Sequence, residues 1–568
     1  MSAPGRRPLA ALGTAIAVGA LAMAPGLPAG SAASRPQRAA APAGRPLPPA
    51  APVEFDLVLR LRERALARYA DGLFDASSAL YGHYLSPAQF GRRFGVGTNA
   101  LESLSERLRR LGLEAVRSYP QETALRVRAT AATVRRVFGV TLLAYVDRSG
   151  ERYDAPSSAP VVPHALAPWA SAVSGLDTRS YATIDTLPFP ALRPKDLAAA
   201  YDVSPLYGIS GDGKGETIAV LSIGRVSLTD YASFSSQIGL PAGPTPLVRV
   251  LSTPDKKDTT EGALDLETVH AIAPQAQIVD YETSWSNLAG AINTIADNNA
   301  ISVVSASFSA CDGYTPSQDD ELPDGFRSDV ESALMAAAMK GDSFFFASGD
   351  SGAYACEQAT PSDTTLSVGF PSDAPYAIAV GGTVLSLNAN GSYQSETAWQ
   401  DDASNQGGGG GLNPVDAAPP WQAAVQIAGV SNGRRQTPDV SAAAGAASPT
   451  LVYDKGDGGF EPVWGTSAAT PIWAASMLLV AQYVEHAGAG PLCFAAPLLY
   501  AIAEKASARP PFHDVTVGGN RYYDAGAGWD FATGWGSPNV YNLATAIVSY
   551  RVSHPLPVSG NACAAALP

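Results

Sequence analysis

The chain has 568 residues, of which 38 are Lys or Arg and 52 are Asp or Glu, so its net charge at pH 7 is -14. This acidic balance argues against a nucleic-acid-binding protein, which needs a basic surface. A composition that is 46% hydrophobic and 16% charged is typical of a globular protein and excludes wholesale disorder.

The charge is divided unevenly along the chain. Residues 1–180 contain 22 Arg, no Lys and 13 acidic residues, whereas residues 181–568 contain 16 basic and 39 acidic residues. The two parts therefore carry net charges of +9 and -23. We expect two modules that attract each other at neutral pH and loosen as carboxylates protonate. A chance bias between independent domains is the alternative.

The N-terminus is typical of an export signal. Arg6 and Arg7 precede an apolar run from Leu9 to about Ala24, and small residues suited to cleavage follow. We expect a signal peptide over residues 1–33 and a Pro/Ala-rich linker over 34–52. The apolar run is too short and too often broken by Gly and Pro to span a membrane. The mature chain is therefore expected to be secreted into the extracellular space, without a membrane segment.

A first domain is expected over residues 53–180. Leucines recur at intervals of three and four over residues 101–111, which predicts an amphipathic helix, and a second helix is expected around 134–138. Short strands are expected at 124–127 and 141–145. This mixture favours an α+β domain with a split β-α-β, ferredoxin-like arrangement.

A second linker, residues 181–194, leads to a large domain over 195–550 and a C-terminal tail over 551–568. In this domain apolar, strand-like runs alternate with helical ones. The expected strands are 217–223, 277–281, 301–308, 343–347 and 376–380, and the expected helices between them are 264–272, 288–296 and 330–339. Continuous apolar strands joined by helical crossovers predict an α/β fold with a mostly parallel sheet covered on both faces.

Four cysteines, Cys311, Cys356, Cys493 and Cys563, fit an oxidising compartment and show no CxxC spacing that would imply zinc. The sequence permits three pairings. We favour Cys311 with Cys356, because both follow neighbouring predicted strands, and Cys493 with Cys563, which would fix the C-terminal tail. Free buried thiols are the alternative.

The strongest local motif is Gly465-Thr466-Ser467-Ala468-Ala469-Thr470-Pro471, which leads into an apolar helix over 472–484. A small-residue turn at a helix N-terminus exposes the Ser467 hydroxyl and places backbone N–H groups beside it. This arrangement suits a nucleophile and the oxyanion that it generates. A capped helix start without chemistry is the alternative.

A catalytic serine needs a base, but none of the six histidines lies in a fitting context, and His270 is expected to cap or pack a helix. Glu261 and Asp265 are four residues apart, so they project from one helix face with Cβ atoms roughly 6 Å apart. Two such carboxylates cannot both ionise easily, so one pKa should rise. Glu261 could then accept the serine proton while Asp265 orients it. An acid pair on a solvated helix is the alternative.

A third candidate is Asp350 in Ser348-Gly349-Asp350-Ser351-Gly352, which follows the strand expected at 343–347. A protonated carboxyl group can donate a hydrogen bond to a tetrahedral oxyanion, but only while it is neutral. By itself this segment is an ordinary loop sequence.

Three further segments accompany these motifs: Tyr81–Phe90, Gly381–Thr383 and Pro438–Val440. Together they give the chain a resemblance to the sedolisin family of serine-carboxyl peptidases, which includes kumamolisin and the tripeptidyl peptidases. The resemblance implies a subtilisin-like parallel sheet flanked by helices, preceded by a pro-kumamolisin-like activation domain. It also implies that this prodomain is an intramolecular inhibitor and chaperone. The implied roles are nucleophile for Ser467, general base for Glu261, partner of that base for Asp265 and oxyanion donor for Asp350.

The segments Phe512–Thr516 and Gly526–Asp530 resemble the two halves of the family's calcium site. Oxygen ligands from carboxylates and backbone carbonyls are those that Ca²⁺ prefers. The resemblance implies one structural ion, with ligands from Asp514, Val515, Gly526, Gly528 and Asp530.

Two positions depart from the family pattern. Members related to kumamolisin have a Glu on the first strand of the catalytic domain and a Trp after a later strand, where this chain has Ser222 and Phe308. We expect these changes to alter the pKa of the acid pair and the substrate subsites without removing the chemistry.

The sequence thus predicts a secreted, acid-active endopeptidase that is made as a self-processing zymogen and acts on proteins and peptides as a monomer. A tripeptidyl exopeptidase is the alternative within the family. A non-catalytic binding protein on the same fold is the alternative from another class.

Overall fold

The computed structural model describes residues 44–557 apart from gaps at 147–151, 179–184, 187–190, 255–258, 312–323, 359–362, 457 and 506. The expected signal peptide, most of the expected first linker and Cys563 lie outside the described residues.

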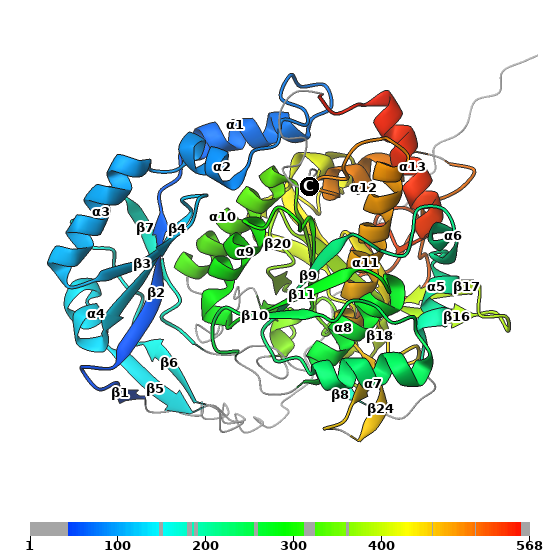
Figure 1. The fold of residues 1–568 in the computed structure, drawn as a ribbon, viewed down its shortest axis with the longest axis horizontal. Coiled ribbons are helices and arrows are strands. Elements are labelled where there is room, and N and C mark those ends of the chain that lie inside the picture. Colours follow the sequence, from blue (N-terminus) through cyan, green and yellow to red (C-terminus); the bar gives the residue numbers. More distant parts are fainter. Residues whose placement is uncertain are drawn as a thin grey trace, which may run out of the picture. The chain divides into compact units, whose positions relative to one another are not determined.

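The N-terminal domain contains a four-stranded antiparallel sheet with the order β3-β4-β2-β7 (Figure 1). Its core lies between this sheet and helices α3 and α4. The third strand along the chain lies between the first and the second, which confirms the expected split β-α-β arrangement. The bounds are β2 Pro52–Leu59, β3 Glu114–Ser118, β4 Ala124–Thr130, β7 Ala170–Ser174, α3 Thr98–Leu111 and α4 Ala131–Phe138.

Residues 44–52, which we expected in the linker, already belong to this domain. Strand β1 (Arg45–Pro46) forms the edge of a small sheet with β5 (Leu142–Val146) and β6 (Arg152–Pro156). Proline is tolerated at a sheet edge, so the composition of this segment concealed its pairing. Two further helices, α1 (Glu63–Phe74) and α2 (Pro87–Phe94), precede α3.

The second domain has an eight-stranded sheet in the order β10-β11-β9-β12-β14-β16-β17, with β22 also paired to β16. All pairs are parallel except β16 with β17, as expected for strands joined by helical crossovers. The bounds are β9 Thr217–Ser222, β10 Leu247–Val250, β11 Gln277–Glu282, β12 Val303–Ala306, β14 Ser343–Ala347, β16 Ile378–Leu387, β17 Tyr393–Ala398 and β22 Val440–Ala443.

Helices cover both faces of this sheet, as expected from its apolar strands. Ala219 and Leu221 of β9 face the cluster that contains α9 (Leu288–Ala296) and α10 (Asp324–Lys340). Ile218 and Val220 face α8 (Thr260–Ile272) and α11 (Thr466–His486) on the opposite side. Within the described ranges, α11 alone is long and apolar enough to cross a membrane, but 83% of its most apolar window is buried inside the protein, so it is a core helix.

The remaining elements connect and extend these layers. The helices are α5 Pro194–Ala200, α6 Ser204–Tyr207, α7 Leu228–Ile238, α12 Ala496–Ala503 and α13 Val540–Ser553. The strands are β8 Asp185–Thr186, β13 Ala310–Cys311, β15 Gly369–Phe370, β18 Gln400–Asp401, β19 Gln406–Gly407, β20 Gly411–Ala417, β21 Arg434–Thr437, β23 Thr450–Asp454, β24 Gly459–Trp464, β25 Phe512–His513 and β26 Ser537–Pro538.

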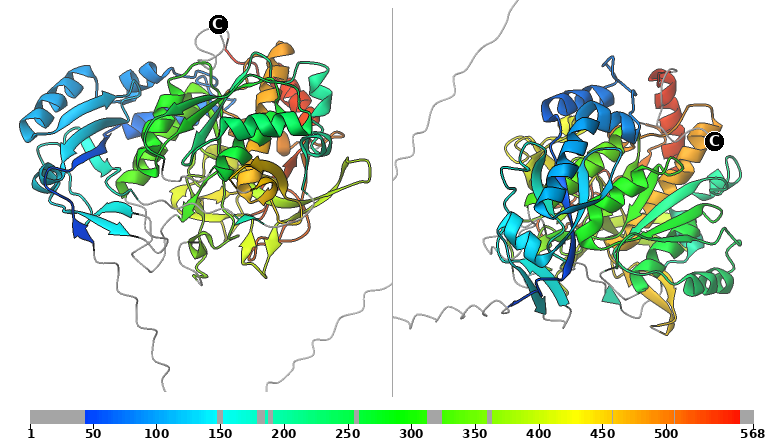
Figure 2. Two further views of the ribbon diagram at one scale, coloured as in Figure 1. Left: turned by 60° about the horizontal axis from the view of Figure 1, so that its bottom comes forward. Right: turned by 60° about the vertical axis from the view of Figure 1, so that its left-hand side comes forward.

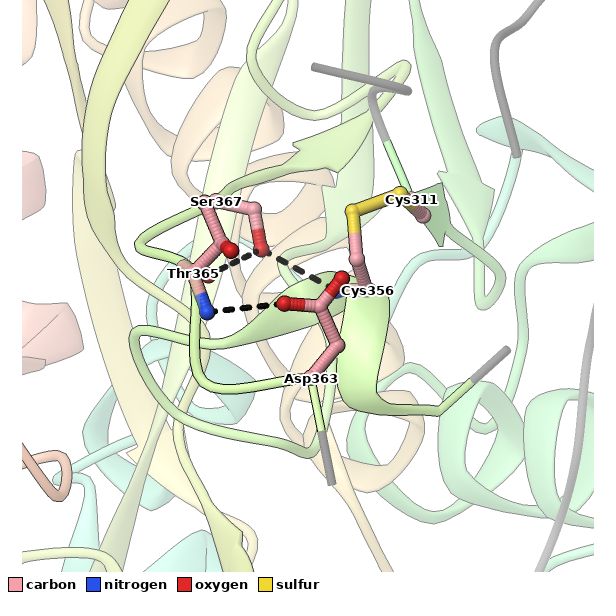
Figure 3. Close-up of a disulfide and its surroundings, with 5 residues drawn as sticks. All are labelled: Cys311, Cys356, Asp363, Thr365 and Ser367. Carbon is pink, nitrogen blue, oxygen red and sulfur yellow. Dashed lines mark hydrogen bonds between the residues drawn. A yellow bond between two sulfur atoms is a disulfide. The ribbon is translucent and has the colours of Figure 1, made fainter. Parts of the chain in front are cut away.

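A disulfide joins Cys311 to Cys356, which confirms the first expected pair (Figure 3). Beside it, the backbone N–H of Cys356 donates to the Ser367 hydroxyl over 3.0 Å. The bond connects β13 to the segment that follows β14. The second expected pair, Cys493 with Cys563, involves a residue outside the described ranges.

The N-terminal domain packs against α9 and α10 of the second domain (Figure 2). Gln121 donates through Nε2 to the Asn293 carbonyl over 3.1 Å, and Thr123 donates to Asn293 Oδ1 over 3.1 Å. Phe74 packs against Trp421 with a ring separation of 5.4 Å. Among the described residues, each ion pair lies within one domain, so we find no support for the attraction expected from the +9 and -23 charges.

Two acidic side chains instead lie buried together at this interface. Asp56 of β2 and Asp329 of α10 are 1% and 0% exposed, and Arg126 Nη1 lies 2.9 Å from Asp56 Oδ2. Burial raises the pKa of both carboxyl groups, and the charge of Asp56 raises the pKa of Asp329 further. For these two groups, protonation therefore favours the docked domains rather than the separated ones.

We predict that Asp329→Asn changes how stability depends on pH. Burial of the Asp329 carboxyl group lowers the free energy of unfolding only at a pH where this group is ionised in the unfolded chain. This cost is therefore absent below the ordinary pKa of Asp, and it grows as the pH rises toward the raised pKa of Asp329 in the folded protein. The variant should therefore gain about 1 kcal/mol or more relative to its parent between pH 4 and pH 7. Urea unfolding of both proteins in a Ser467→Ala background measures this difference, with exposed Asp402→Asn as the control. An equal difference at the two pH values would contradict the coupling.

Candidate functional site

The candidate residues meet at the carboxyl edge of the central sheet. Ser307 follows the end of β12, and Asp350 follows the end of β14, its neighbour in the sheet. Helix α11 begins beside them and carries Ser467 in its first turn. The carboxyl ends of parallel strands are where α/β sheets bind their ligands.

Ser467 is half-buried at the second position of α11. The first N–H groups of a helix have no partner within the helix, so they can face an anion held at this end. The Ser467 hydroxyl donates a long hydrogen bond of 3.3 Å to the carbonyl oxygen of Ser307. The structure therefore places the expected nucleophile at a helix N-terminus, as the motif indicated.

Asp265 of α8 is connected to Ser467 through Ser307. The Ser307 hydroxyl donates to Asp265 Oδ1 and also lies 3.1 Å from the carbonyl oxygen of Ser467. Asp265 is 1% exposed, and burial raises its pKa well above the ordinary range. The sequence interpretation missed Ser307, although its place at the end of an apolar strand was a usable signal.

Glu261 lies in the first turn of α8, one turn before Asp265, and is half-buried. After burial, its charge is the largest cause that raises the pKa of Asp265. The expected interaction between the two carboxylates is therefore present.

Asp350 contacts the residue that precedes Ser467. Its Oδ1 accepts hydrogen bonds from the backbone N–H of Thr466 over 2.7 Å and from the Thr466 hydroxyl over 2.8 Å. Gly465 has φ +130, and a Cβ at this position would lie 2.7 Å from Asp350 Oδ2. The glycine of the motif thus allows the carboxyl group to reach the start of α11.

A run of five glycines, Gly407–Gly411, packs against the loop that carries Asp350. Gly407 N–H donates to the Asp350 carbonyl over 2.8 Å, and Gly409 N–H donates to the Gly349 carbonyl over 2.7 Å. A Cβ at Gly409 would lie 2.1 Å from the carbonyl oxygen of Ser348. The sequence interpretation did not use this run, although its composition marks a close backbone approach.

Arg521 fixes the other side of the same loop. Its Nη1 donates to the carbonyl oxygens of Ser351 over 3.0 Å and Asn405 over 2.8 Å, and to Glu357 Oε2 over 2.5 Å. Arg521 adopts φ +75, a strained conformation for a residue with a side chain. The position of Asp350 is therefore held by contacts from distant parts of the chain.

The histidines take no part in these contacts. His270 packs against Tyr231 with the two rings tilted and their centroids 5.0 Å apart, and burial lowers its pKa to about 4. It packs α8 against α7, as we expected.

The C-terminal loop offers oxygen ligands for a cation. Asp530 Oδ2 accepts from Gly526 N–H over 2.8 Å, and Asp514 Oδ2 accepts from Gly528 N–H over 3.0 Å, so both carboxylates face one loop. No hydrogen bond between described residues uses the carbonyl oxygens of Val515, Gly526 and Gly528. Two carboxylates and three available carbonyls fit a hard cation. The described part of the chain contains no group of three or more acidic, His or Cys side chains that could hold a metal alone.

Family models match two parts of the chain. A model described as "Pro-kumamolisin, activation domain" matches residues 41–179, and one described as "Subtilase family" matches residues 256–536.

Three proteins with similar sequences match between 39% and 87% of the chain. Sedolisin of Pseudomonas sp. (strain 101) is 28% identical over 536 residues, which cover 87% of each protein. Kumamolisin of Bacillus sp. (strain MN-32) is 31% identical and covers 73% of this chain and 77% of its own. Tripeptidyl-peptidase 1 of Bos taurus is 32% identical over 246 residues, 39% of this chain.

A solved structure agrees with these relatives. It is that of Pseudomonas sedolisin, a serine-carboxyl proteinase, complexed with two molecules of pseudo-iodotyrostatin, and it matches with a TM-score of 0.55 and 28% identity. The match covers 65% of this chain and 99% of that one.

We predict that Gly465→Ala destabilises the protein by about 1–3 kcal/mol, because the new Cβ would be forced against Asp350 at an unfavourable φ. The cost should be smaller in an Asp350→Ala background, where only the backbone strain remains. Denaturant unfolding of the four proteins of this double-mutant cycle measures the difference. Equal costs in both backgrounds would show that Asp350 does not lie against Gly465.

Proposed function

The chain belongs to the sedolisin family of serine-carboxyl peptidases, and on that basis we propose that it is a secreted, acid-active endopeptidase that is made as a self-processing zymogen. The observation that carries the proposal is the connection of a buried acid, Asp265, to Ser467 through the Ser307 hydroxyl. The proposed substrates are proteins and peptides, and the proposed active form is a monomer.

In the proposed mechanism Ser467 Oγ bonds to the carbonyl carbon of a peptide while Glu261 accepts the serine proton. Asp350 donates a hydrogen bond to the oxyanion. Glu261 then gives the proton to the leaving amine as the C–N bond breaks, and water hydrolyses the acyl-enzyme. Because the Ser467 hydroxyl bonds the Ser307 carbonyl in this structure, it must first leave that oxygen.

The proposed acid activity rests on the proton that burial keeps on Asp265 and on a neutral Asp350. Burial and the charge of Glu261 raise the pKa of Asp265, so the Glu261–Asp265 pair retains one proton in acid and loses it as the pH rises. Asp350 can donate to an oxyanion only when it is neutral. Since its Oδ1 accepts both hydrogen bonds from Thr466, Oδ2 is the oxygen that would carry the proton.

Secretion and zymogen processing are proposed from other features. The Cys311–Cys356 disulfide supports an oxidising compartment, and the N-terminal sequence is typical of an export signal. The activation domain matched over residues 41–179 supports an intramolecular inhibitor and chaperone that is removed on maturation.

We predict that purified zymogen converts itself at pH 3 to 5, and that Ser467→Ala and Asp350→Ala each remain at full length because no acyl-enzyme forms. Electrophoresis and sequencing of the new N-terminus measure the conversion. Two exposed substitutions, Ser549→Ala and Asp402→Asn, serve as controls that should mature normally. A Ser467→Ala protein that matures alone would falsify the assignment.

The released enzyme then distinguishes the two peptidase activities. An endopeptidase cleaves a peptide whether or not its N-terminus is blocked, whereas a tripeptidyl exopeptidase needs a free amino group. We expect N-acetylated peptides to be cleaved at a rate within about tenfold of that of the free peptides. This limit corresponds to a difference of about 1.4 kcal/mol in activation free energy. Release of tripeptides from free peptides alone would assign the alternative activity.

We also propose one structural Ca²⁺ in the C-terminal loop, held by Asp514, Asp530 and the carbonyls of Val515, Gly526 and Gly528. The carboxylates and free carbonyls support this set. Burial raises the pKa of Asp530 to about 6, so an ion bound there would keep this carboxylate charged in acid. The ion would fix the loop that carries Arg521.

We predict that Ca²⁺ raises the melting temperature of the Ser467→Ala protein and that a chelator lowers it. At 100 times its Kd, a ligand that binds only the folded state adds about 2.7 kcal/mol. Asp530→Asn should abolish this shift, whereas the exposed control Asp402→Asn should retain it. Scanning calorimetry with Ca²⁺, with Mg²⁺ and with chelator measures it, and an equal response of Asp530→Asn would contradict the site.

A further inference from the structure

Asp280 is a buried acid that the proposed mechanism does not use. It lies on β11 with Ile278 and Glu282 on the same face, because side chains alternate along a strand. Ile278 packs in one cluster with Leu266 and Val269 of α8. Asp280 therefore faces the helix that carries Glu261 and Asp265.

The contacts of Asp280 leave one oxygen unsatisfied. Its side chain is 0% exposed, and Oδ1 accepts a hydrogen bond of 2.6 Å from the Ser222 hydroxyl at the end of β9. Oδ2 is buried and has no hydrogen-bond partner among the described residues. An orphaned buried carboxylate oxygen is costly, so a purely structural role would be better served by Asn or by an apolar residue.

The charged groups around Asp280 that the described residues supply are acidic. The charge of Asp280 is among the causes that raise the pKa of Asp265 on α8, and Glu282 lies two residues further along its own strand. Apart from burial, the groups that act on Asp280 are the Ser222 hydroxyl and the Glu282 charge. Among the residues that the structure describes, no cation acts on Asp280 to compensate the negative charge that its ionisation would create.

We propose that Asp280 is a positioning residue for the Glu261–Asp265 pair, a third carboxyl group that sets the pH at which this pair gives up its proton. This inference rests on the proposed function. Strand β11 pairs with β9, and Ser222 stands where the family pattern has a glutamate. The neighbouring strand thus supplies the carboxyl group that the first strand lacks.

The effect of Asp280 depends on its own charge. Burial raises the pKa of Asp280 to about 7, so the group is neutral in acid and ionises near neutrality. The charge of ionised Asp280 raises the pKa of Asp265. As the pH rises, Asp280 therefore opposes the loss of the proton that the pair shares.

Asp280→Asn tests this role, because asparagine keeps the acceptor for Ser222 and removes the charge. We expect the alkaline limb of the kcat/KM profile to move to lower pH by about one unit, with KM at the optimum unchanged. The double variant Ser222→Asp/Asp280→Ser exchanges the two side chains, so a carboxyl group is again present, now on the adjacent strand β9. It should return the alkaline limb of the kcat/KM profile to the pH of the parent.

The control is Glu396→Gln at another buried acid, which accepts hydrogen bonds from Tyr201 and Thr383 away from the site. It should lower the melting temperature without moving the pH profile. An unmoved alkaline limb in folded Asp280→Asn would overturn the proposal, as would an equal shift in Glu396→Gln. If Asp280→Asn does not fold, Asp280→Ser takes its place.

Failure of the proposed function would be seen separately. In that case the parent protein would show no activity that depends on Ser467. Potentiometric titration of Ser467→Ala against Ser467→Ala/Asp280→Asn then decides the role of Asp280 without any turnover. The double variant should release one proton fewer near pH 7, because the Asp280 carboxyl group is absent. The Glu261–Asp265 pair should lose its proton at a lower pH in the double variant than in Ser467→Ala. Identical lower steps in the two curves would overturn the proposal.

Discussion

The hydrogen bond from the Ser307 hydroxyl to Asp265 is the interaction on which the site depends. It joins the end of a central strand to the helix that carries the acid pair, and the same residue contacts both the carbonyl and the hydroxyl of Ser467. Three elements from distant parts of the chain are thereby held within hydrogen-bond reach. Because Asp265 is fully buried, loss of this bond would leave a carboxyl oxygen without a partner. An unsatisfied buried polar atom is costly in free energy, so the contact is important for the stability of the site.

Burial of carboxyl groups recurs across the molecule and raises their pKa values in two separate places. On α8, burial and the charge of Glu261 raise the pKa of Asp265. At the interface between the domains, Asp56 and Asp329 bind protons more tightly when docked, so acid strengthens their contact. Protonation of these two groups alone would therefore not separate the N-terminal domain from the second domain.

Much of the architecture could be predicted from the sequence, because apolar runs and leucine spacing report directly on buried strands and helices. The strand at 343–347 and the helix at 288–296 have the expected bounds. Motifs with unusual residue types located Ser467, Asp265 and Asp350. Ser307, Asp280 and Arg521 were missed, because their roles arise from strand pairing and loop contacts between residues far apart in sequence.

The glycine run Gly407–Gly411 depends on backbone contacts for its order. Glycine loses more conformational entropy on folding than any other residue, and this run has no side chains with which to regain it. Its order depends on backbone hydrogen bonds to the Asp350 loop and on the close approach of its neighbours. The loop that carries Asp350 therefore rests on a segment whose order comes from backbone contacts alone, so a side chain added to one of the tightly packed glycines, such as Gly409, would displace this loop directly.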